Sequence, residues 1–340
     1  MSAAALTFAV PAAALRVMFV IPGDGSGSSM IFARRQAQSL EQEGVETKLF
    51  YLGSRTSFVT LFKEFRRMRT EMARFAPQVV HAHFGTMTAL FAALACGATP
   101  LVVTYRGSDL NRTPRSYGSL AKMRAAAGRI CSQIAALRAS RIVCVSKQLR
   151  ERLWWRKEIA SVLPSGVDPR VFAPEPRDHA RRKLGWSETD RVVLFNSGHD
   201  VLIKRLDLAR AAFEEARRRV PALRMEILDG KIRPALLPDL MNAADCLLLT
   251  SECEGSPTVA QEALACGLPI VSVEVGDIVE RLEGVDASTV ASPDAATLAI
   301  AIQSMVDPPR RSNGRKKIGE FSSQQIASRL KEIYEEIRGH

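Results

Sequence analysis

The chain has 340 residues, of which 46% are hydrophobic and 24% charged, a composition typical of a folded soluble protein rather than a disordered or fibrous one. No hydrophobic run approaches the ~20 residues that a membrane-spanning helix needs. The six cysteines form no CxxC pair, which argues against a disulfide framework or a zinc site and favours buried thiols in the cytoplasm.

The positive charge lies in the first half of the chain. Residues 1–168 contain 23 Lys and Arg against 10 Asp and Glu, a net charge of +13, whereas residues 169–340 contain 24 against 26, a net charge of −2. The length predicts two domains of roughly 150 residues each. We therefore expect the two domains to meet different partners.

Short β-rich runs alternate with helical patterns along the first half of the chain. Strands are expected at 15–22, 47–52, 78–83, 101–105 and 141–145. Helices are expected at 28–43, 61–75, 89–96 and 120–139. Strands separated by helices in this order predict a parallel, doubly wound sheet.

The second half repeats the same alternation. Strands are expected at 192–196, 224–228, 246–250 and 270–273, and helices at 205–219, 235–243 and 258–266. The fold class is thus α/β, with two Rossmann-like, doubly wound parallel sheets that face each other across a cleft. Ligands of such sheets bind at the carboxyl ends of the strands.

The boundary between the domains is expected in LPSGVDPRVFAPEPR (163–177), because this stretch is rich in Pro and Gly and lacks periodicity. We assign residues 1–165 to an N-terminal, acceptor-side domain and residues 166–320 to a C-terminal, nucleotide-binding domain. Residues 321–340 are expected to form a helix that packs back on the N-terminal domain.

The most informative segment is TSECEGSPTVAQEALACGLPIVSVEVGD (250–277), which leaves a strand, turns at Gly255 and enters a helix. We expect Ser256 at the N-cap and Pro257 at the first helical position. The first turn, at Thr258, then presents free N–H groups and the positive end of the helix dipole to the cleft. Such a helix terminus suits a diphosphate without a metal ion.

Two carboxylates flank this helix start. Glu254 precedes the helix, and Glu262 follows eight positions later. One carboxylate would reach the group beyond the phosphates, and the other would reach the hydroxyls of a ribose. In the alternative interpretation, Glu254 only caps the helix electrostatically and Glu262 is an exposed helix residue.

The motif SECEGSP…QEALACGLPIVSVEVGD resembles the donor-binding signature of the family-4 retaining glycosyltransferases, which have the GT-B fold. In that family the first glutamate contacts the donor sugar and the second binds the nucleotide ribose. The resemblance implies these roles for Glu254 and Glu262. It extends to SKQLRERL (146–153) and LPSGVDPRVFAP (163–174), which are similar to the family's entry into its second domain.

Two further loops carry the resemblance. In NSGHDVLIKRLDLA (196–209), Lys204 matches the family lysine that approaches the diphosphate, and His199 stands where arginine is more common. PGDGSGSSM (22–30) resembles a phosphate-binding loop, in which Gly27 and Ser28 half preserve the family's Gly-Gly pair. In the alternative interpretations, Lys204 is only a solvated lysine at a helix start, and residues 22–30 form only a flexible turn.

The sequence departs from the family in VVTYRGSDLN (102–111), where Arg106 stands in place of a histidine that often lies close to the sugar. Arginine cannot act as an acid–base at neutral pH, but it can stabilise phosphate or donate hydrogen bonds. Asp109 is either an acceptor-side group or a turn cap. His81 and His83 are expected at a strand end that faces the cleft, with His83 on the acceptor side. For both histidines, hydrogen bonding is favoured over metal binding.

A second departure is the short connector DGKIRP (229–234). The family usually carries a further helix and strand here, and this region contributes to the base pocket. We therefore expect a contracted second domain, and the residues that hold the base stay unassigned.

The resemblance implies transfer of a sugar from a nucleoside diphosphate sugar with retention, through Glu254, Lys204 and Arg106, and without a metal or other cofactor. A UDP-sugar is the most frequent donor in the family and a GDP-sugar the next. The acceptor would be a saccharide or a lipid-linked molecule in the synthesis of a cell-surface polysaccharide or glycoconjugate. The alternatives are a nucleotide-sugar epimerase of the same fold and a non-catalytic nucleotide-sugar-binding protein.

The helix expected at 61–75 combines an apolar face with basic side chains. Its apolar residues are Leu61, Phe62, Phe65, Met68, Met72 and Phe75, and its basic residues are Lys63, Arg66, Arg67 and Arg74. The pattern fits an ordinary core helix, but together with the charge of the N-terminal half it also predicts docking on an anionic inner membrane face. No motif indicates a nucleic-acid partner.

Overall fold

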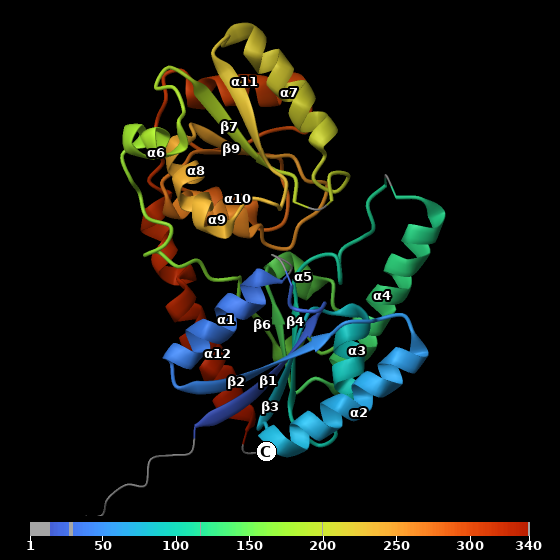
Figure 1. Ribbon diagram of the computed structural model, residues 1–340. Helices are drawn as coiled ribbons and strands as arrows, with labels where there is room; N and C mark the ends of the chain where they lie inside the picture. Colours follow the sequence, from blue (N-terminus) through green and yellow to red (C-terminus); the bar gives the residue numbers. More distant parts are fainter. Residues whose placement is uncertain (1–13, 27–29, 116, 199, 339–340) are drawn as a thin grey trace, which may run out of the picture.

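The computed structural model describes residues 14–26, 30–115, 117–198 and 200–338. They form two α/β domains stacked end to end, with the first domain below the second in Figure 1. The α/β class and the two Rossmann-like parallel sheets predicted from the sequence are confirmed. Gly27, Ser28 and His199 lie outside the described residues.

The first domain has a six-stranded parallel sheet of order β2-β1-β3-β4-β5-β6. Its strands are β1 (Leu15–Pro22), β2 (Val45–Leu52), β3 (Val79–His83), β4 (Leu101–Tyr105), β5 (Arg141–Cys144) and β6 (Ala160–Val162). The helices between them are α1 (Ile31–Gln42), α2 (Phe58–Phe75), α3 (Thr86–Ala95), α4 (Ser119–Arg138) and α5 (Lys147–Glu151).

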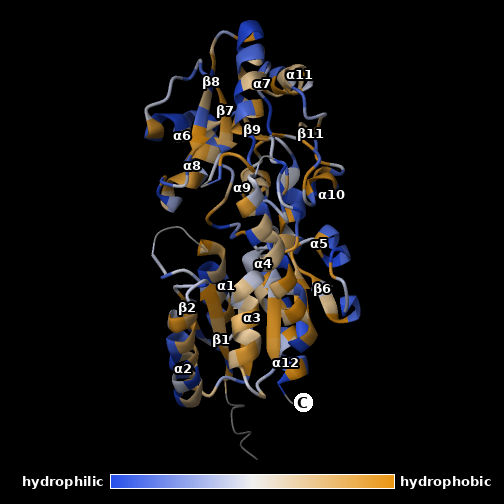
Figure 2. Cartoon of the chain, turned by 90° about the vertical axis from the view of Figure 1, so that its right-hand side faces the viewer, coloured by the Kyte–Doolittle hydropathy of each residue, from blue (hydrophilic) through white to orange (hydrophobic). Residues whose placement is uncertain are grey.

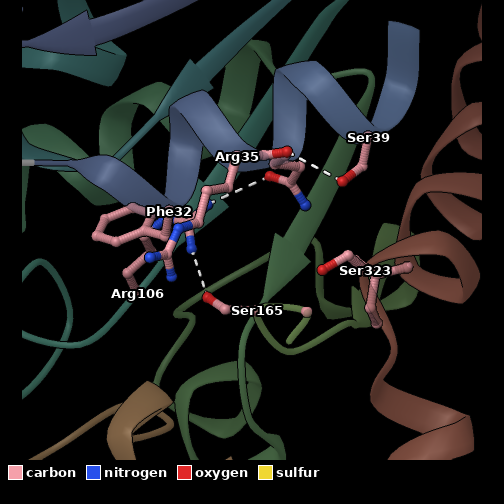
Figure 3. Close-up of a pocket in the computed structure, with 9 residues that line it drawn as sticks. Phe32, Arg35, Ser39, Arg106, Ser165 and Ser323 are labelled. Atoms are coloured by element: carbon pink, nitrogen blue, oxygen red, sulfur yellow. Dashed lines mark hydrogen bonds between the residues drawn. The ribbon is translucent and has the colours of Figure 1, made fainter. Parts of the chain in front are cut away.

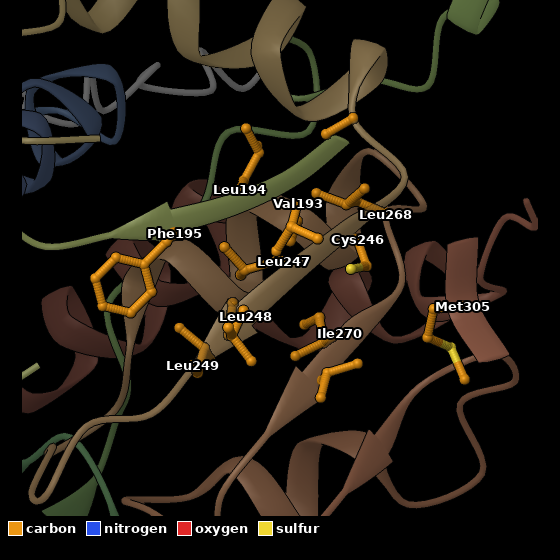
Figure 4. Packing of buried hydrophobic residues seen from close by; sticks show 14 of the residues in the cluster. Val193, Leu194, Phe195, Cys246, Leu247, Leu248, Leu249, Leu268, Ile270 and Met305 are labelled. Atoms are coloured by element: carbon orange, nitrogen blue, oxygen red, sulfur yellow. The ribbon is translucent and has the colours of Figure 1, made fainter. Parts of the chain in front are cut away.

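The second domain has a five-stranded parallel sheet of order β11-β10-β9-β7-β8. Its strands are β7 (Arg191–Asn196), β8 (Leu223–Leu228), β9 (Cys246–Leu249), β10 (Ile270–Ser272) and β11 (Thr289–Val290). Its helices are α6 (Arg177–Leu184), α7 (Leu206–Arg219), α8 (Leu237–Ala243), α9 (Thr258–Ala265), α10 (Ile278–Leu282) and α11 (Ala295–Val306). The apolar side chains of β7 and β9 meet at its centre (Figure 4).

The contraction of the second domain is visible at β8. This strand lies at the edge of the sheet, and the fully described residues 229–234 lead from it directly to a short 3-10 turn, Pro234–Leu236, before α8. Because no neighbour covers its outer side, four of its six residues are only partly buried. Residues 229–233, all of them described, contain neither a helix nor a strand.

The last helix, α12 (Ser323–Ile337), lies on the first domain next to α1 (Figure 1). Leu330 and Tyr334 are fully buried in a cluster that includes residues of β1 and α1. The two chain segments that join the domains also bond to each other, because Ser323 N donates to the carbonyl of Val167 at 2.9 Å.

Candidate functional site

The site lies where the carboxyl ends of the two sheets face each other. Arg106 follows β4 of the first domain, whereas Lys204 and Glu254 belong to loops that follow β7 and β9 of the second. These three side chains line one cavity of about 250 Å³. Parallel strands concentrate loops at this edge, so residues distant in sequence come together here.

The loop that carries Lys204 is tied to its own domain by hydrogen bonds. Asp200 caps the turn by accepting from the N–H groups of Leu202 and Ile203 at 3.2 and 3.0 Å. The hydroxyl of Thr250, just after β9, donates to the carbonyl of Lys204 at 2.8 Å. These bonds fix the backbone from which the lysine reaches the cavity.

Lys204 forms an ion pair with Glu254. The hydroxyl of Ser251 donates a second hydrogen bond to the same carboxylate oxygen of Glu254, at 2.9 Å. Both charged side chains remain partly open to the cavity, with exposed fractions of 20% and 17%. The pair therefore places one cation and one anion side by side at the wall of the cleft.

Helix α9 begins at Thr258, as its expected range of 258–266 has it, but its N-cap lies one residue later than expected. Pro257 is the N-cap, with extended backbone (φ −69°, ψ 108°), and Thr258 is the first helical residue. The expected cap at Ser256 is wrong because its hydroxyl instead accepts from Gln261 Nε2 and Arg281 Nη2, both at 3.1 Å. Pro257 and Thr258 line the cavity, so the helix start with its unbonded N–H groups still faces it.

Glu262 lies in a second cavity of about 190 Å³, which shares Phe32, Asn196 and Thr258 with the first. The interpretation of Glu262 as an exposed residue is wrong, because it is only 7% exposed. Its carboxylate accepts a hydrogen bond at 3.2 Å from Arg35, which belongs to α1 of the other domain. Burial raises the pKa of Glu262 to about 7, although Arg35 acts in the opposite direction.

The two domains touch at backbone level between Gly255 and Arg106. A Cβ atom on Gly255 would lie 1.9 Å from the carbonyl oxygen of Arg106, and one on Gly107 would lie 3.1 Å from the backbone nitrogen of Gly255. Gly107 also has φ +154°, a conformation that L side chains rarely adopt. Glycine at 255 is therefore a steric requirement of the observed cleft.

The guanidinium of Arg106 is held by neutral groups. It donates to Ser165 Oγ at 2.8 Å, to Gln36 Oε1 at 3.3 Å and to His83 Nδ1 at 3.1 Å. Its central carbon lies 3.9 Å from the centroid of the Phe32 ring. Burial lowers the pKa of Arg106 to about 9, so it remains a cation at neutral pH.

The predicted cleft-facing positions of the histidines are wrong. His81 and His83 are fully buried in the β3 layer, with ring centroids 4.0 Å apart. His81 bonds to Tyr334 of α12 and to Thr104, and burial holds the pKa of both histidines well below 6.5. His83 therefore serves as a neutral hydrogen-bond acceptor for Arg106.

Asp109 has the turn-cap role. Its carboxylate is fully buried and accepts from the backbone N–H groups of Gly85, Arg106 and Gly107 at 2.8 to 3.1 Å. These bonds shape the loop that brings Arg106 to Gly255, as the alternative interpretation of Asp109 as a turn cap expects. Within the described ranges, no three His, Cys, Asp or Glu side chains converge in a group that could hold a metal ion.

Sequence reasoning missed the contribution of α1. Phe32 and Arg35 of this helix line both the 190 Å³ cavity and a small pocket under α1 that Figure 3 shows, with Arg106 and Ser165 beneath them. Their spacing of three residues indicates one helix face, but only the tertiary structure shows that this face meets the second domain.

Comparison with known proteins places the chain among glycosyltransferases. A family model described as Glycosyltransferase Family 4 matches residues 28–171, and one described as Glycosyl transferases group 1 matches residues 195–307. A Bacillus subtilis protein described as a teichuronic acid biosynthesis glycosyltransferase is 29% identical over 224 residues, covering 59% of this chain and 54% of the relative. A D-inositol 3-phosphate glycosyltransferase of Thermobispora bispora is 28% identical over 235 residues, covering 57% and 54%. The chain spans about half the length of these relatives.

Solved structures share the whole fold. The sucrose-phosphate synthase of Thermosynechococcus elongatus superposes with a TM-score of 0.76 at 17% identity, covering 95% of this chain and 98% of the other. The Anabaena protein HepE, crystallised with UDP-glucose, superposes with a TM-score of 0.70 at 16% identity, covering 95% and 100%. Two stacked parallel-sheet domains with a cleft between their strand ends define the GT-B class.

Within that class, the chain belongs to the family-4 glycosyltransferases.

We predict that Gly255→Ala opens the cleft, because the new methyl group cannot coexist with the carbonyl oxygen of Arg106. Small-angle scattering should show a larger radius of gyration for this variant while its circular dichroism stays unchanged. Gly53→Ala is the matched control, because a Cβ atom at Gly53 meets nothing within 4 Å and its φ is ordinary. Identical scattering of all three proteins would mean that the Gly255 contact does not set the domain arrangement.

Proposed function

We propose that the protein transfers a sugar from a nucleoside diphosphate sugar to a hydroxyl acceptor, with retention at the anomeric carbon. The observation that carries this proposal is the pair of adjoining cavities, with Lys204, Glu254 and the start of α9 at one and Glu262 at the other. The first cavity has a polar wall suited to a sugar diphosphate, and the second has a partly apolar wall suited to a nucleoside.

The donor would bind along both cavities. Its diphosphate would lie against the N–H groups at Thr258, where the helix dipole favours negative charge. Glu254 would then contact the sugar, and Glu262 would accept hydrogen bonds from the ribose hydroxyls in the other cavity. The apolar residues Ile232, Pro234 and Leu237 of the contracted connector and the start of α8 line that cavity and would surround the base.

The leaving group would be stabilised without a metal ion. As the bond between the anomeric carbon and the phosphate oxygen breaks, negative charge grows on the diphosphate. Lys204 and the start of α9 are preorganised to face that charge, which is the form of stabilisation that lowers a barrier most. These groups would supply the role that Mg²⁺ has in other transferases.

Retention would follow from attack on the same face that the diphosphate leaves. The acceptor oxygen bonds to the anomeric carbon, and its proton passes to a leaving phosphate oxygen. This route, which the family resemblance implies, needs no protein nucleophile. Its lack of a protein base is consistent with the structure, because Asp109 and His83 are buried and already bonded.

A UDP-sugar is the donor we favour. The Anabaena relative crystallised with UDP-glucose has the same two-domain arrangement over its full length. Acceptors in the synthesis of a cell-surface polysaccharide or glycoconjugate are supported by the relatives described for teichuronic acid synthesis and for transfer to inositol phosphate. The family matches favour a transferase over an epimerase or a non-catalytic binding protein.

We predict that nucleotide affinity rises with pH through Glu262. Ribose hydroxyls donate hydrogen bonds, so they favour the ionised carboxylate, which burial makes scarce below a pKa of about 7. UDP or GDP should therefore bind about tenfold more weakly at pH 6 than at pH 8, since one pH unit below a pKa leaves about a tenth of the group ionised. Calorimetry in two buffers of different ionisation enthalpy would also detect the proton released on binding.

Glu262→Gln should bind the nucleotide weakly and without this pH dependence, whereas Glu283→Gln, at an exposed position of the same domain, should behave like the wild type. A wild type that binds neither UDP nor GDP would contradict the proposed function. Unchanged affinity in Glu262→Gln would contradict the ribose assignment alone.

We also propose that the first domain docks on an anionic membrane, through α4 rather than through α2. Phe62 of α2 is 64% exposed rather than on the core face, and Arg67 is engaged by Glu64 and Glu71. A stronger signal lies on α4. The exposed apolar residues of this helix are Leu120, Met123, Ile130, Ile134 and Leu137.

The apolar residues of α4 form a single stripe because they recur at helical spacing, while small residues such as Ala135 and Ala136 pack inward. Figure 2 looks onto the side of the molecule where α4 and α3 lie, with α2 beside them. The helix contains Lys122, Arg124, Arg129 and Arg138 and no acidic residue. This charge disfavours pairing with a second copy of itself and favours anionic lipid phosphates. No helix among the described residues could cross a bilayer.

We predict that the protein sediments with vesicles of phosphatidylcholine containing phosphatidylglycerol, and that binding fades as salt approaches ~1 M. Met123→Glu with Ile130→Glu should abolish binding, because the apolar stripe can no longer enter the interface. Ile300→Glu should leave binding unchanged, because Ile300 is a similarly exposed apolar residue (56%) on α11 of the other domain. Equal binding to pure phosphatidylcholine, or unaltered binding of the double variant, would contradict membrane docking through α4.

A further inference from the structure

The guanidinium of Arg106 has no carboxylate partner among the described residues. Its hydrogen bonds go to a hydroxyl, an amide oxygen and a neutral imidazole, those of Ser165, Gln36 and His83. Its Nε is buried and makes no hydrogen bond. Figure 3 shows this cation lying below Phe32 at the floor of the pocket under α1.

The carboxylates in this region are engaged elsewhere. Asp109 accepts hydrogen bonds from backbone N–H groups, including that of Arg106 itself, but does not reach the guanidinium. Glu254 is paired with Lys204. The charge of Asp109 acts on Arg106 from a distance, but no carboxylate of the described residues bonds to the guanidinium, so a ligand could supply a hydrogen-bonded anion there.

The position of Arg106 indicates which part of a ligand supplies that anion. Arg106 shares the 250 Å³ cavity with Glu254, Lys204 and Thr258, and its backbone carbonyl adjoins Gly255. A sugar held by Glu254 would therefore lie between the two domains, with Arg106 on its far side. The diphosphate of the same donor is already matched by Lys204 and the start of α9.

We propose that Arg106 binds a carboxylate on the transferred sugar, so that the donor is a nucleoside diphosphate uronic acid. This inference rests on the proposed function. A planar guanidinium that lines a cavity matches a carboxylate better than the hydroxymethyl group of a neutral hexose. His83, Ser165 and Gln36 would position the guanidinium, since they hold it from the protein side.

Calorimetry with matched donors tests the inference. UDP-glucuronate and UDP-glucose differ only at C6, as do UDP-galacturonate and UDP-galactose. The wild type should bind the uronate of one pair at least about tenfold more tightly than its neutral partner, as expected for a charge-assisted hydrogen bond. Arg106→Gln should lose this preference, and Arg106→Lys should keep part of it. Affinity for UDP alone should be the same in all three proteins.

Equal affinity of the wild type for both members of every pair, or a preference that survives in Arg106→Gln, would overturn the uronate assignment. The carboxylate could also belong to the acceptor. A comparison of turnover with acceptors that do and do not contain a carboxylate distinguishes this case from a uronate donor. If Arg106→Gln lowers turnover only for the anionic acceptor, the carboxylate belongs to the acceptor and the donor assignment is wrong. If neither UDP nor GDP binds the wild type, the proposed function fails as well.

Discussion

The site depends on the contact between the backbone of Gly255 and the carbonyl of Arg106. At this point the loops of the two domains touch at backbone level, and a single methyl group on Gly255 would already overlap with an oxygen atom. The close approach brings the loop after β4 and the start of α9 to opposite walls of one cavity. Asp109 maintains it from the first domain by capping the loop through three backbone N–H groups.

The charged side chains of the cleft form two ion pairs around this contact. Lys204 is paired with Glu254 within the second domain, whereas Arg35 and Glu262 are paired between the domains. In a partly buried cleft, a charge that loses its partner is unfavourable. A ligand that displaces one partner of such an ion pair must therefore bring a charge of its own. The guanidinium of Arg106 differs from both pairs, because within the described part of the chain its hydrogen bonds go only to neutral groups.

Local patterns in the sequence predict the α/β class and most of the order of elements. The short connector 229–234 predicts a smaller second sheet, which has five strands in the structure with β8 at one edge. The brief elements β6, β11, α5 and α10 were not predicted because two to five residues carry no measurable periodicity, and the longer helices α6 and α11 were also missed.

The candidate site was predictable only in part. The motif around Glu254 identifies the helix start, but Pro257 replaces Ser256 as the cap because the serine hydroxyl has other partners. The burial of Glu262 and its bond to Arg35 depend on α1 of the other domain, more than two hundred residues away in sequence. No local pattern reports such a contact.

We propose that the cleft transfers a sugar without a metal ion and with retention. The most direct test incubates the purified protein with a panel of sugar nucleotides and a cell-envelope lipid extract in EDTA, and determines the anomeric configuration of the product by NMR. We expect product to form at the same rate with and without EDTA and to keep the configuration of the donor. An inverted product, or complete loss of turnover in EDTA that Mg²⁺ or Mn²⁺ restores, would contradict it.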